Sequence, residues 1–287
     1  MNDTVLISVL VLGGIGIVCA IVLYLTAKKF NVYENPKIGE VEELLPGANC
    51  GGCGMKGCHD FACACADATS LEGLNCPSSG QAVMDQIAEI LGLKKEIAVP
   101  KIAVVKCNGT CEFRPKTSIY DGPQSCRILN SLYIGSSDCA YGCLGCGDCV
   151  EHCQFDAIKM NPETGLPEVS EELCVGCGAC VKACPRDIIE LRNKGPRGMR
   201  VYVACSNKDK GALASKECKV ACIGCGKCVK ECAQDAIVVE NNLAYIDFEK
   251  CKLCKKCVDV CPMHSILAVN FPIKVKKEES KAVETNI

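Results

Sequence analysis

The cysteines between Cys143 and Cys184 have the spacing needed to bind metal clusters. They form two runs of four, in which successive thiols are separated by two, two and three residues. Two-residue steps let three thiolates of one loop converge on one four-iron cluster, while the fourth thiolate reaches the neighbouring cluster. Zinc sites more often use separated Cys-x2-Cys pairs, and a disulfide framework would not require this spacing. The expected ligand sets are Cys143, Cys146, Cys149 and Cys184 for one cluster, and Cys153, Cys174, Cys177 and Cys180 for the other.

The same pattern recurs in the C-terminal part of the chain, which indicates duplication of a whole unit. In both copies, a pair of cysteines with twelve residues between them precedes the runs: Cys126 and Cys139, then Cys205 and Cys218. A short hydrophobic stretch after each fourth cysteine predicts a helical turn leading into a strand. The ligand sets expected in the second copy are Cys222, Cys225, Cys228 and Cys261, and Cys232, Cys251, Cys254 and Cys257.

Composition agrees with cluster binding. The chain has 287 residues and 29 cysteines, lacks tryptophan, and contains only 5% aromatic residues. Metal ligation can supply the folding free energy that so few large side chains cannot. An odd and very large number of thiols indicates a reducing compartment, and a net charge of −2 gives no indication of a nucleic-acid partner.

The N-terminal segment predicts a membrane span. Val5 to Ala27 carries no charge and is long enough to cross a bilayer as a helix. A signal peptide would need a basic region before the apolar one, whereas here Lys28 and Lys29 follow it. The positive-inside rule then places the rest of the chain in the cytoplasm.

A further cysteine group follows an acidic connector over residues 31–45. Its glycine-rich surroundings would let the backbone wrap a single four-iron cluster. Cys63 and Cys65 are interpreted as small buried residues of a helix, and the apolar spacing in 81–91 predicts another helix. The expected ligands are Cys50, Cys53, Cys58 and Cys76.

The segment between this group and the first run leaves two alternatives open. Ile102 to Val105 reads as a short strand. The cysteines around it either bind a sixth cluster or are structural thiols. The set considered for a sixth cluster is Cys107, Cys111, Cys126 and Cys139.

These patterns predict an α+β protein that binds five 4Fe–4S clusters, or six. The expected parts are a transmembrane anchor (1–29), a small 4Fe–4S domain (30–95), a linker with the first two-cluster ferredoxin-like module (96–200), the second such module (201–273), and a disordered tail (274–287). His59, His152 and His264 are too scattered for a catalytic site, and no nucleotide-binding loop is evident. The residues themselves therefore indicate an electron carrier.

Taken together, the order of the motifs resembles the B subunits of the Rnf complex. The matching features are the apolar helix, GANCGGCG, VVKCNGTC, YGCLGCGDCVEHC, CVGCGACVKACP, CIGCGKCVKEC and CKLCKKCVDVCP. The resemblance implies the electron-transfer subunit of an ion-translocating ferredoxin:NAD oxidoreductase in the inner (plasma) membrane. Its partners would be soluble ferredoxin and the other subunits, which would perform NAD reduction and sodium or proton transport. In this family the position of Cys139 is commonly cysteine and that of Cys146 is not always, so the resemblance makes Cys139 an alternative ligand to Cys146.

Other classes fit less well. A ferredoxin-type subunit of a membrane hydrogenase or formate dehydrogenase would share the repeated runs, but not the Cys50–Cys76 group directly after a membrane span. A corrinoid methyl carrier would need a cobalamin-binding segment that the chain lacks. A purely structural metal protein would not need repeated cluster motifs. Within the favoured interpretation, the short connector holds the Cys50–Cys76 cluster near the bilayer, so ferredoxin is expected to meet the modules further along the chain.

Overall fold

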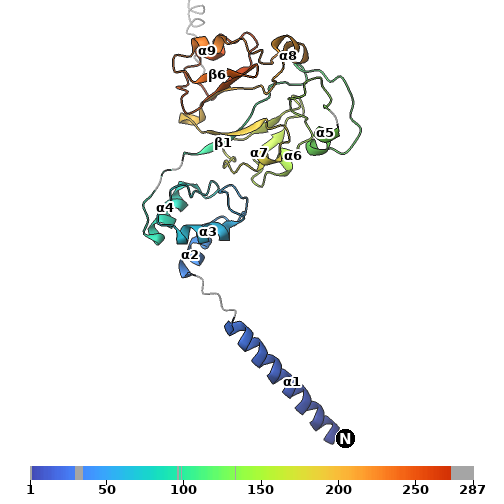
Figure 1. The fold of residues 1–287 in the computed structure, drawn as a ribbon, viewed down its shortest axis with the longest axis vertical. Helices are drawn as coiled ribbons and strands as arrows, with labels where there is room; N and C mark the ends of the chain where they lie inside the picture. Colours follow the sequence, from blue (N-terminus) through green and yellow to red (C-terminus); the bar gives the residue numbers. More distant parts are fainter. Residues whose placement is uncertain (1, 30–34, 96, 98, 133, 273–287) are drawn as a thin grey trace, which may run out of the picture.

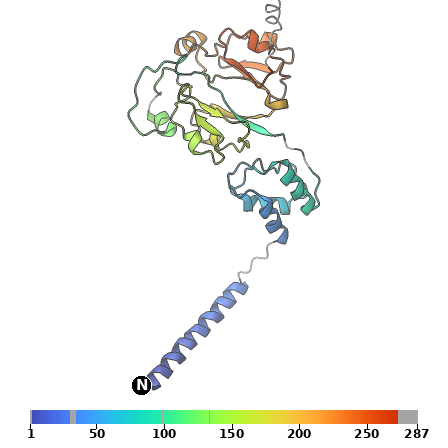
Figure 2. The same cartoon turned by 180° about the vertical axis from the view of Figure 1, so that it is seen from behind.

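The computed structural model describes residues 2–29, 35–95, 97, 99–132 and 134–272. Along the longest axis of the molecule, a single helix is followed by a small helical domain and then by the two cysteine-rich modules (Figures 1 and 2). The tail predicted for 274–287 lies outside the described residues. The mixed α+β class is confirmed, because short helices and two-stranded sheets alternate through the modules.

The N-terminal helix α1 (Asn2–Lys29) stands apart from the rest of the chain (Figure 1). Within it, Val9–Lys29 has a mean hydropathy of 2.6, and its side chains pack on no other part of the described chain. Lys28 and Lys29 form its last turn. Among the described residues it is the one helix long and apolar enough to cross a membrane.

The small domain consists of α2 (Pro36–Leu44), α3 (Cys58–Asp67) and α4 (Gly80–Leu91). Helix α2 corrects the expectation of a plain connector over 31–45. Asn35 accepts a hydrogen bond from the Lys37 amide (3.1 Å) and so caps α2, and Pro36 suits its first turn. Ile38 and Val41, spaced for one helix face, are buried in the domain core. The α2 segment has only three apolar residues among its glutamates, which were too few to predict an apolar helix face from the sequence.

Each module contains two antiparallel two-stranded sheets, and the strand predicted after each fourth cysteine forms as β2, β4, β6 or β8. In the first, β1 (Lys101–Val105) pairs with β4 (Ile189–Asn193), and β2 (Ile158–Met160) pairs with β3 (Pro167–Val169). In the second, β5 (Arg200–Val203) pairs with β8 (Ile266–Val269), and β6 (Ile237–Glu240) pairs with β7 (Leu243–Ile246). The short helices are α5 (Cys126–Leu132), α6 (Asp148–Glu151), α7 (Ala179–Ala183), η1 (Pro196–Gly198), α8 (Gly211–Glu217), α9 (Lys227–Glu231) and α10 (Lys256–Asp259).

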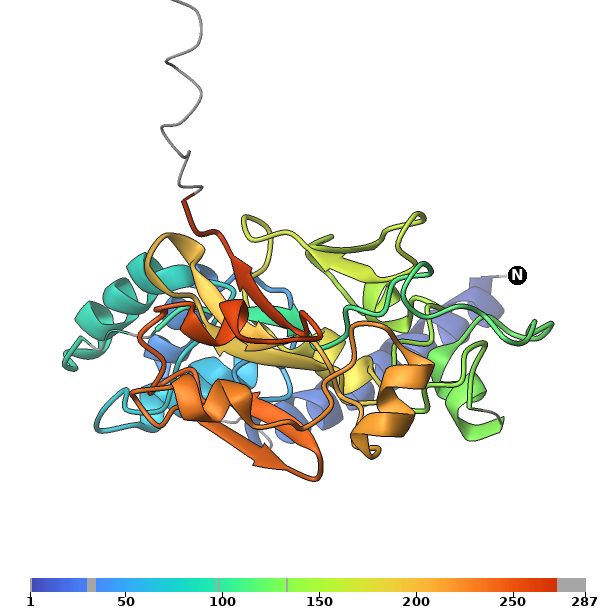
Figure 3. The ribbon, with the colours of Figure 1, turned by 90° about the horizontal axis from the view of Figure 1, so that it is seen from above.

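The modules pack against each other beside the β1–β4 sheet of the first and the β5–β8 sheet of the second (Figure 3). Val104 of β1 forms a buried cluster with Tyr202 of β5 and with Ala204. Arg192 of β4 is almost fully buried at this contact. Its guanidinium pairs with Glu190 and lies over the rings of three aromatic residues of the second module, which are Tyr202, Tyr245 and Phe248. A paired and stacked arginine thus links the two modules.

Candidate functional site: cysteine-lined cavities

The structure brings the predicted ferredoxin-type quartets together around separate cavities of similar size, about 340 to 370 Å³. Three of the cavities are lined by all four expected cysteines, and the fourth by three of its four. In both modules the last cysteine of each run crosses to the partner cavity, as the spacing predicted. The complete sets are Cys153, Cys174, Cys177 and Cys180; Cys222, Cys225, Cys228 and Cys261; and Cys232, Cys251, Cys254 and Cys257.

The loops between the cysteines use left-handed glycines to turn tightly. Gly176, between Cys174 and Cys177, has φ +72°, and a Cβ there would lie 2.6 Å from the Lys101 carbonyl oxygen. Only glycine fits both the conformation and the space. A neighbouring strand also directs a backbone amide at sulfur, since the Ala244 N–H of β7 lies 3.5 Å from Cys222 Sγ. Such hydrogen bonds stabilise cluster sulfurs and tune their potential.

Burial makes the cavity thiols difficult to ionise unless they bind a cation. Burial, followed by the charges of neighbouring cysteines, raises the pKa of Cys180 to about 12, and burial likewise raises that of Cys257 to about 12. Deprotonation then requires a bound cation as compensation. In the part of the chain described, no three His, Cys, Asp or Glu side chains converge closely enough to hold a single metal ion. Thiols spread around a cavity suit a multi-iron cube.

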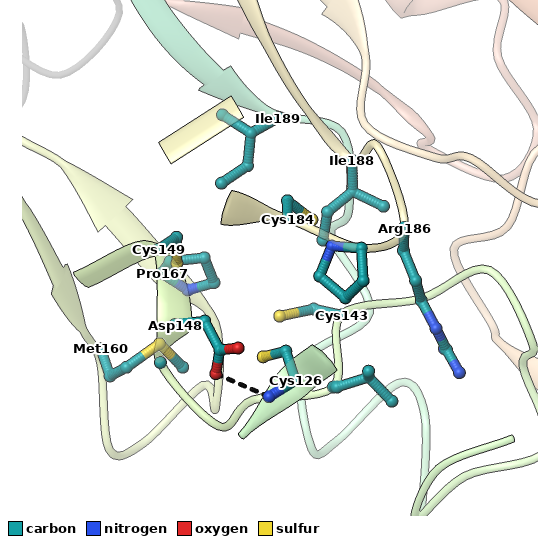
Figure 4. Close-up of a pocket in the computed structure, with 13 residues that line it drawn as sticks. Cys126, Cys143, Asp148, Cys149, Met160, Pro167, Cys184, Arg186, Ile188 and Ile189 are labelled. Atoms are coloured by element: carbon teal, nitrogen blue, oxygen red, sulfur yellow. Dashed lines mark hydrogen bonds between the residues drawn. The ribbon is translucent and has the colours of Figure 1, made fainter. Parts of the chain in front are cut away.

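The remaining ferredoxin-type cavity differs from its sequence prediction (Figure 4). Cys143, Cys149 and Cys184 line it as expected, but the further thiol in its wall is Cys126 rather than Cys146. Cys139, the alternative ligand, does not line this cavity. The thiol of Cys146 is hydrogen-bonded to that of Cys126. This cavity therefore has five cysteines at or beside it.

A buried aspartate holds Cys126 in place. Asp148 accepts hydrogen bonds from the amides of Cys126 (2.6 Å) and Arg127 (3.1 Å) and from the Ser125 hydroxyl (3.0 Å). Burial opposes ionisation of Asp148, but these donors outweigh it and keep its pKa below the usual value. The start of helix α5, which lies outside the ferredoxin motif, is thus held against helix α6 of that motif.

A fifth cavity, of about 300 Å³, is also lined by cysteines. The sixth set considered from the sequence is not brought together. Cys107 and Cys139 meet here, but Cys126 lies at the cavity described above, and Cys111 is exposed with its amide bonded to the Thr164 carbonyl (3.1 Å). The cysteines that do line this cavity are Cys107, Cys139, Cys205 and Cys218. The sequence indicated that Cys139 and Cys218 are equivalent, because each ends a repeated spacing of twelve residues. Cys107 is not part of that repeat.

In the small domain, Cys53 and Cys58 pack on the core to which the buried Cys76 belongs. Cys50 Sγ lies 3.3 Å from the hydroxyl of Ser78, which brings the first loop beside the Cys76 segment. Cys65 is fully buried, as expected for a structural thiol, and burial, followed by the charges of Cys53 and Cys76, raises its pKa to about 11. The four predicted ligands therefore belong to neighbouring segments of one domain.

The small domain touches the first module at a cluster loop. A Cβ on Gly52 would lie 2.8 Å from Cys177 Cα and 2.9 Å from Cys177 Cβ. Cys50 is also close enough to influence the Cys177 thiol electrostatically. The backbone of one predicted cluster site thus lies directly against the backbone of another.

Comparison with known proteins agrees with this geometry. Family models described as 4Fe–4S dicluster domains match residues 142–188 and 221–265, and another of that description matches 173–237. The chain is 46% identical over 93% of its length to the B subunit of the Na⁺-translocating ferredoxin:NAD⁺ oxidoreductase complex of Acetobacterium woodii, covering 78% of that protein. It is 39% identical over 99% of its length to the B subunit of the proton-translocating ferredoxin:NAD⁺ oxidoreductase complex of Clostridium ljungdahlii, covering 99% of that protein. The B subunit of an ion-translocating oxidoreductase complex of Methanosarcina acetivorans is 39% identical, with 93% of this chain and 99% of that protein covered.

The chain belongs to the family of Rnf B subunits. It is thus the iron–sulfur subunit of an ion-translocating ferredoxin:NAD oxidoreductase complex. The complex is membrane-bound, and helix α1 is consistent with a membrane anchor. The chain binds 4Fe–4S clusters through its dicluster domains.

Proposed function

We propose that this subunit carries single electrons from reduced ferredoxin, through five 4Fe–4S clusters, to the membrane subunits of the complex. Each cluster supplies a site that gains and loses one electron. The chain's own residues hold the clusters, exclude water and set the order in which they meet. The ligands would be the quartets beginning at Cys50, Cys174, Cys222 and Cys251, with the crossed fourth cysteines described above, and for the remaining cluster Cys143, Cys149 and Cys184 with one further thiol.

The contact between Gly52 and Cys177 is the observation that supports this direction. It connects the first module to the small domain, which is the part of the fold nearest to α1 in the chain and in Figure 1. Cys177 belongs to the loop that would hold one module cluster, and Cys50 to the loop that would hold the cluster of the small domain. Electrons that reach the Cys177 loop therefore have a direct route toward the membrane.

The second module is suited to receive ferredoxin. Lys252, Lys255 and Lys256 line the cavity of the Cys251 run, and the Cys254 thiol is exposed beside them. A cluster of lysines attracts an acidic partner and speeds its encounter. An exposed ligand also brings a cluster close to the protein surface. We assign the electron-accepting end to this cavity.

The anchor and orientation follow from α1. With Lys28 and Lys29 at its C-terminal end, the cluster domains would lie on the cytoplasmic side of the plasma membrane. Protease added to inside-out vesicles should then digest the modules. Digestion only from the outer face would reverse this orientation.

Replacement of Cys58 by serine tests the route. Cys58 begins α3 in the small domain, so the modules should fold normally without it. Reduced ferredoxin should still bleach the module clusters of the Cys58→Ser complex, while NAD reduction should be largely lost. NAD reduction near the wild-type rate would mean that electrons reach the membrane subunits without passing through the small domain, and would overturn the proposed order of clusters.

A further inference from the structure

The cavity of Cys107, Cys139, Cys205 and Cys218 lies between the two modules. Cys107 follows the end of β1 by two residues, and Cys205 follows the end of β5 by two. Cys139 precedes Cys143 and Cys218 precedes Cys222 by the same interval. Each module therefore contributes one cysteine after a strand and one before its first cluster loop.

The two halves of this cavity are related by an approximate twofold repetition. Val105 of β1 is opposite Ile189, and Val203 of β5 is opposite Ile266, at matching places after Cys184 and Cys261. The segments that follow β1 and β5 are also hydrogen-bonded to each other. The Asn108 amide donates to the Ala204 carbonyl (2.9 Å), and the Ser206 hydroxyl donates to the Lys106 carbonyl (3.0 Å). Cys107 is thus the spatial counterpart of Cys205.

The hydrogen bonds to the sulfurs repeat in the same way. Cys139 and Cys218 each accept from the amide two residues later, at Tyr141 and Val220. Cys107 accepts from the amide of Cys143 (3.5 Å). In the other half, Cys205 accepts from the amide of Cys222. Sulfurs that each receive backbone donors are typical of cluster ligands.

The wall of the cavity suits an anionic, sulfur-rich group. Nε of Arg114 is buried there without a hydrogen-bond partner, although buried donors are almost always satisfied. Gly142 makes room for the Arg114 guanidinium beside the thiols, because a Cβ there would lie 3.2 Å from Arg114 Cζ and 3.5 Å from Cys139 Sγ. The cavity, about 300 Å³, is close in size to the ferredoxin-type cavities of 340 to 370 Å³.

We infer that these four cysteines bind a sixth 4Fe–4S cluster, which relays electrons between the modules. The inference rests on the proposed electron-transfer function. Cys107 accepts a hydrogen bond from the amide of Cys143, and Cys205 accepts one from the amide of Cys222. The site therefore adjoins one cluster loop in each module. One electron enters from the second module and one leaves to the first, and no bond is made or broken. The clusters then form a single line from the lysine-lined cavity to the small domain.

Native mass spectrometry of the full chain, purified anaerobically, counts the clusters directly. Six four-iron clusters correspond to about 24 iron atoms per chain, whereas five correspond to about 20. The double variant Cys205→Ala/Cys218→Ala should lose about four iron atoms and keep the other clusters. Cys111→Ser, an exposed cysteine outside every cavity described above, is the matched control and should keep the wild-type count.

The outcomes separate this inference from the proposed function. Five clusters in the wild-type chain, or one zinc or iron ion at this site, would overturn the sixth cluster while leaving the electron-transfer role intact. Six clusters that ferredoxin does not reduce would support the site and contradict the proposed function. In the double variant, ferredoxin should still bleach the second module, but reduction of the first module should be at least tenfold slower. An unchanged rate would exclude the relay.

A separate observation concerns Cys126. In the second module, Cys225 lines its cavity, but its counterpart Cys146 does not, and Cys126 takes that place in the wall. Figure 4 shows the Cys126 and Cys143 sulfurs directed into the same space. We propose that Cys126 is the fourth ligand of this cluster and that Cys146 is a neighbouring spare thiol.

Matched serine variants decide between the two thiols. Cys126→Ser should alter the electron paramagnetic resonance spectrum of one cluster or lower the iron count, and Cys146→Ser should change neither. Cys225→Ser in the second module is the positive control and should lose a cluster. The reverse result, with Cys146→Ser damaging the cluster and Cys126→Ser harmless, would overturn the assignment.

Discussion

Replacing Gly52 by alanine perturbs the contact between the small domain and the first module by one methyl group. The new Cβ would lie 2.8 Å from Cys177 Cα, about 0.6 Å short of the 3.4 Å at which ordinary contact begins. Because the opposing atoms belong to a backbone inside a cluster loop, they cannot move aside as a flexible side chain would. The Gly52 backbone is not left-handed, so the substitution introduces steric conflict without conformational strain.

Overpacking of this kind costs about 1–3 kcal/mol. If the interface relieves the conflict by opening, the ratio of docked to undocked domains falls by about 5- to 150-fold, since 1.4 kcal/mol corresponds to a factor of ten. The ligands of both clusters are untouched. We therefore expect full iron content with impaired transfer between the two domains.

The assay compares two rates in membranes that contain the intact complex. Bleaching of the module clusters by reduced ferredoxin should match the wild type, and ferredoxin-dependent NAD reduction should fall, by as much as the docking ratio falls where docking is marginal in the wild type. Gly39→Ala, in the exposed face of α2 where a Cβ meets nothing within 4 Å, is the matched control and should leave both rates unchanged. Wild-type NAD reduction by Gly52→Ala would show that electrons do not pass through this contact.

Other substitutions test the remaining parts of the proposal. The double variant Lys252→Gln/Lys256→Gln should slow reduction of the clusters by ferredoxin and weaken the dependence of this rate on ionic strength. Stopped-flow bleaching at two salt concentrations measures this rate, and an unchanged salt dependence would mean that ferredoxin binds elsewhere. Deleting residues 1–29 should yield a soluble brown protein, checked by ultracentrifugation, and a product that remains with the membranes would contradict the role of α1. Arg192→Leu should destabilise the module contact by about 1.5–3 kcal/mol, because Glu190 loses one charged partner and keeps Lys106 (3.0 Å); anaerobic thermal unfolding should show a lower midpoint, and an unchanged midpoint would mean that this ion pair contributes little.

The sequence by itself determined the features that depend on local spacing. Three cysteines separated by two residues each can reach one cluster wherever the loop lies, so the grouping of the ferredoxin-type cysteines around four cavities, with the fourth cysteines crossed, was predictable except at Cys146. The apolar run of α1 and the strand predicted at 102–105, which forms as β1 (Lys101–Val105), likewise follow from the local sequence. The matching order of motifs also sufficed for the family.

Tertiary structure alone decided the sites assembled from distant segments. Cys107 is the spatial counterpart of Cys205 because β1 and β5 occupy equivalent places in two packed modules. The spacing of the repeat had instead made Cys126 the equivalent of Cys205. Cys126 reaches its cavity because a buried Asp148 fastens its helix there, and no pattern along the chain encodes that bond. The contact of Gly52 with Cys177 likewise depends on how two domains dock. Local geometry follows from residue spacing, but the meeting of distant thiols follows only from packing.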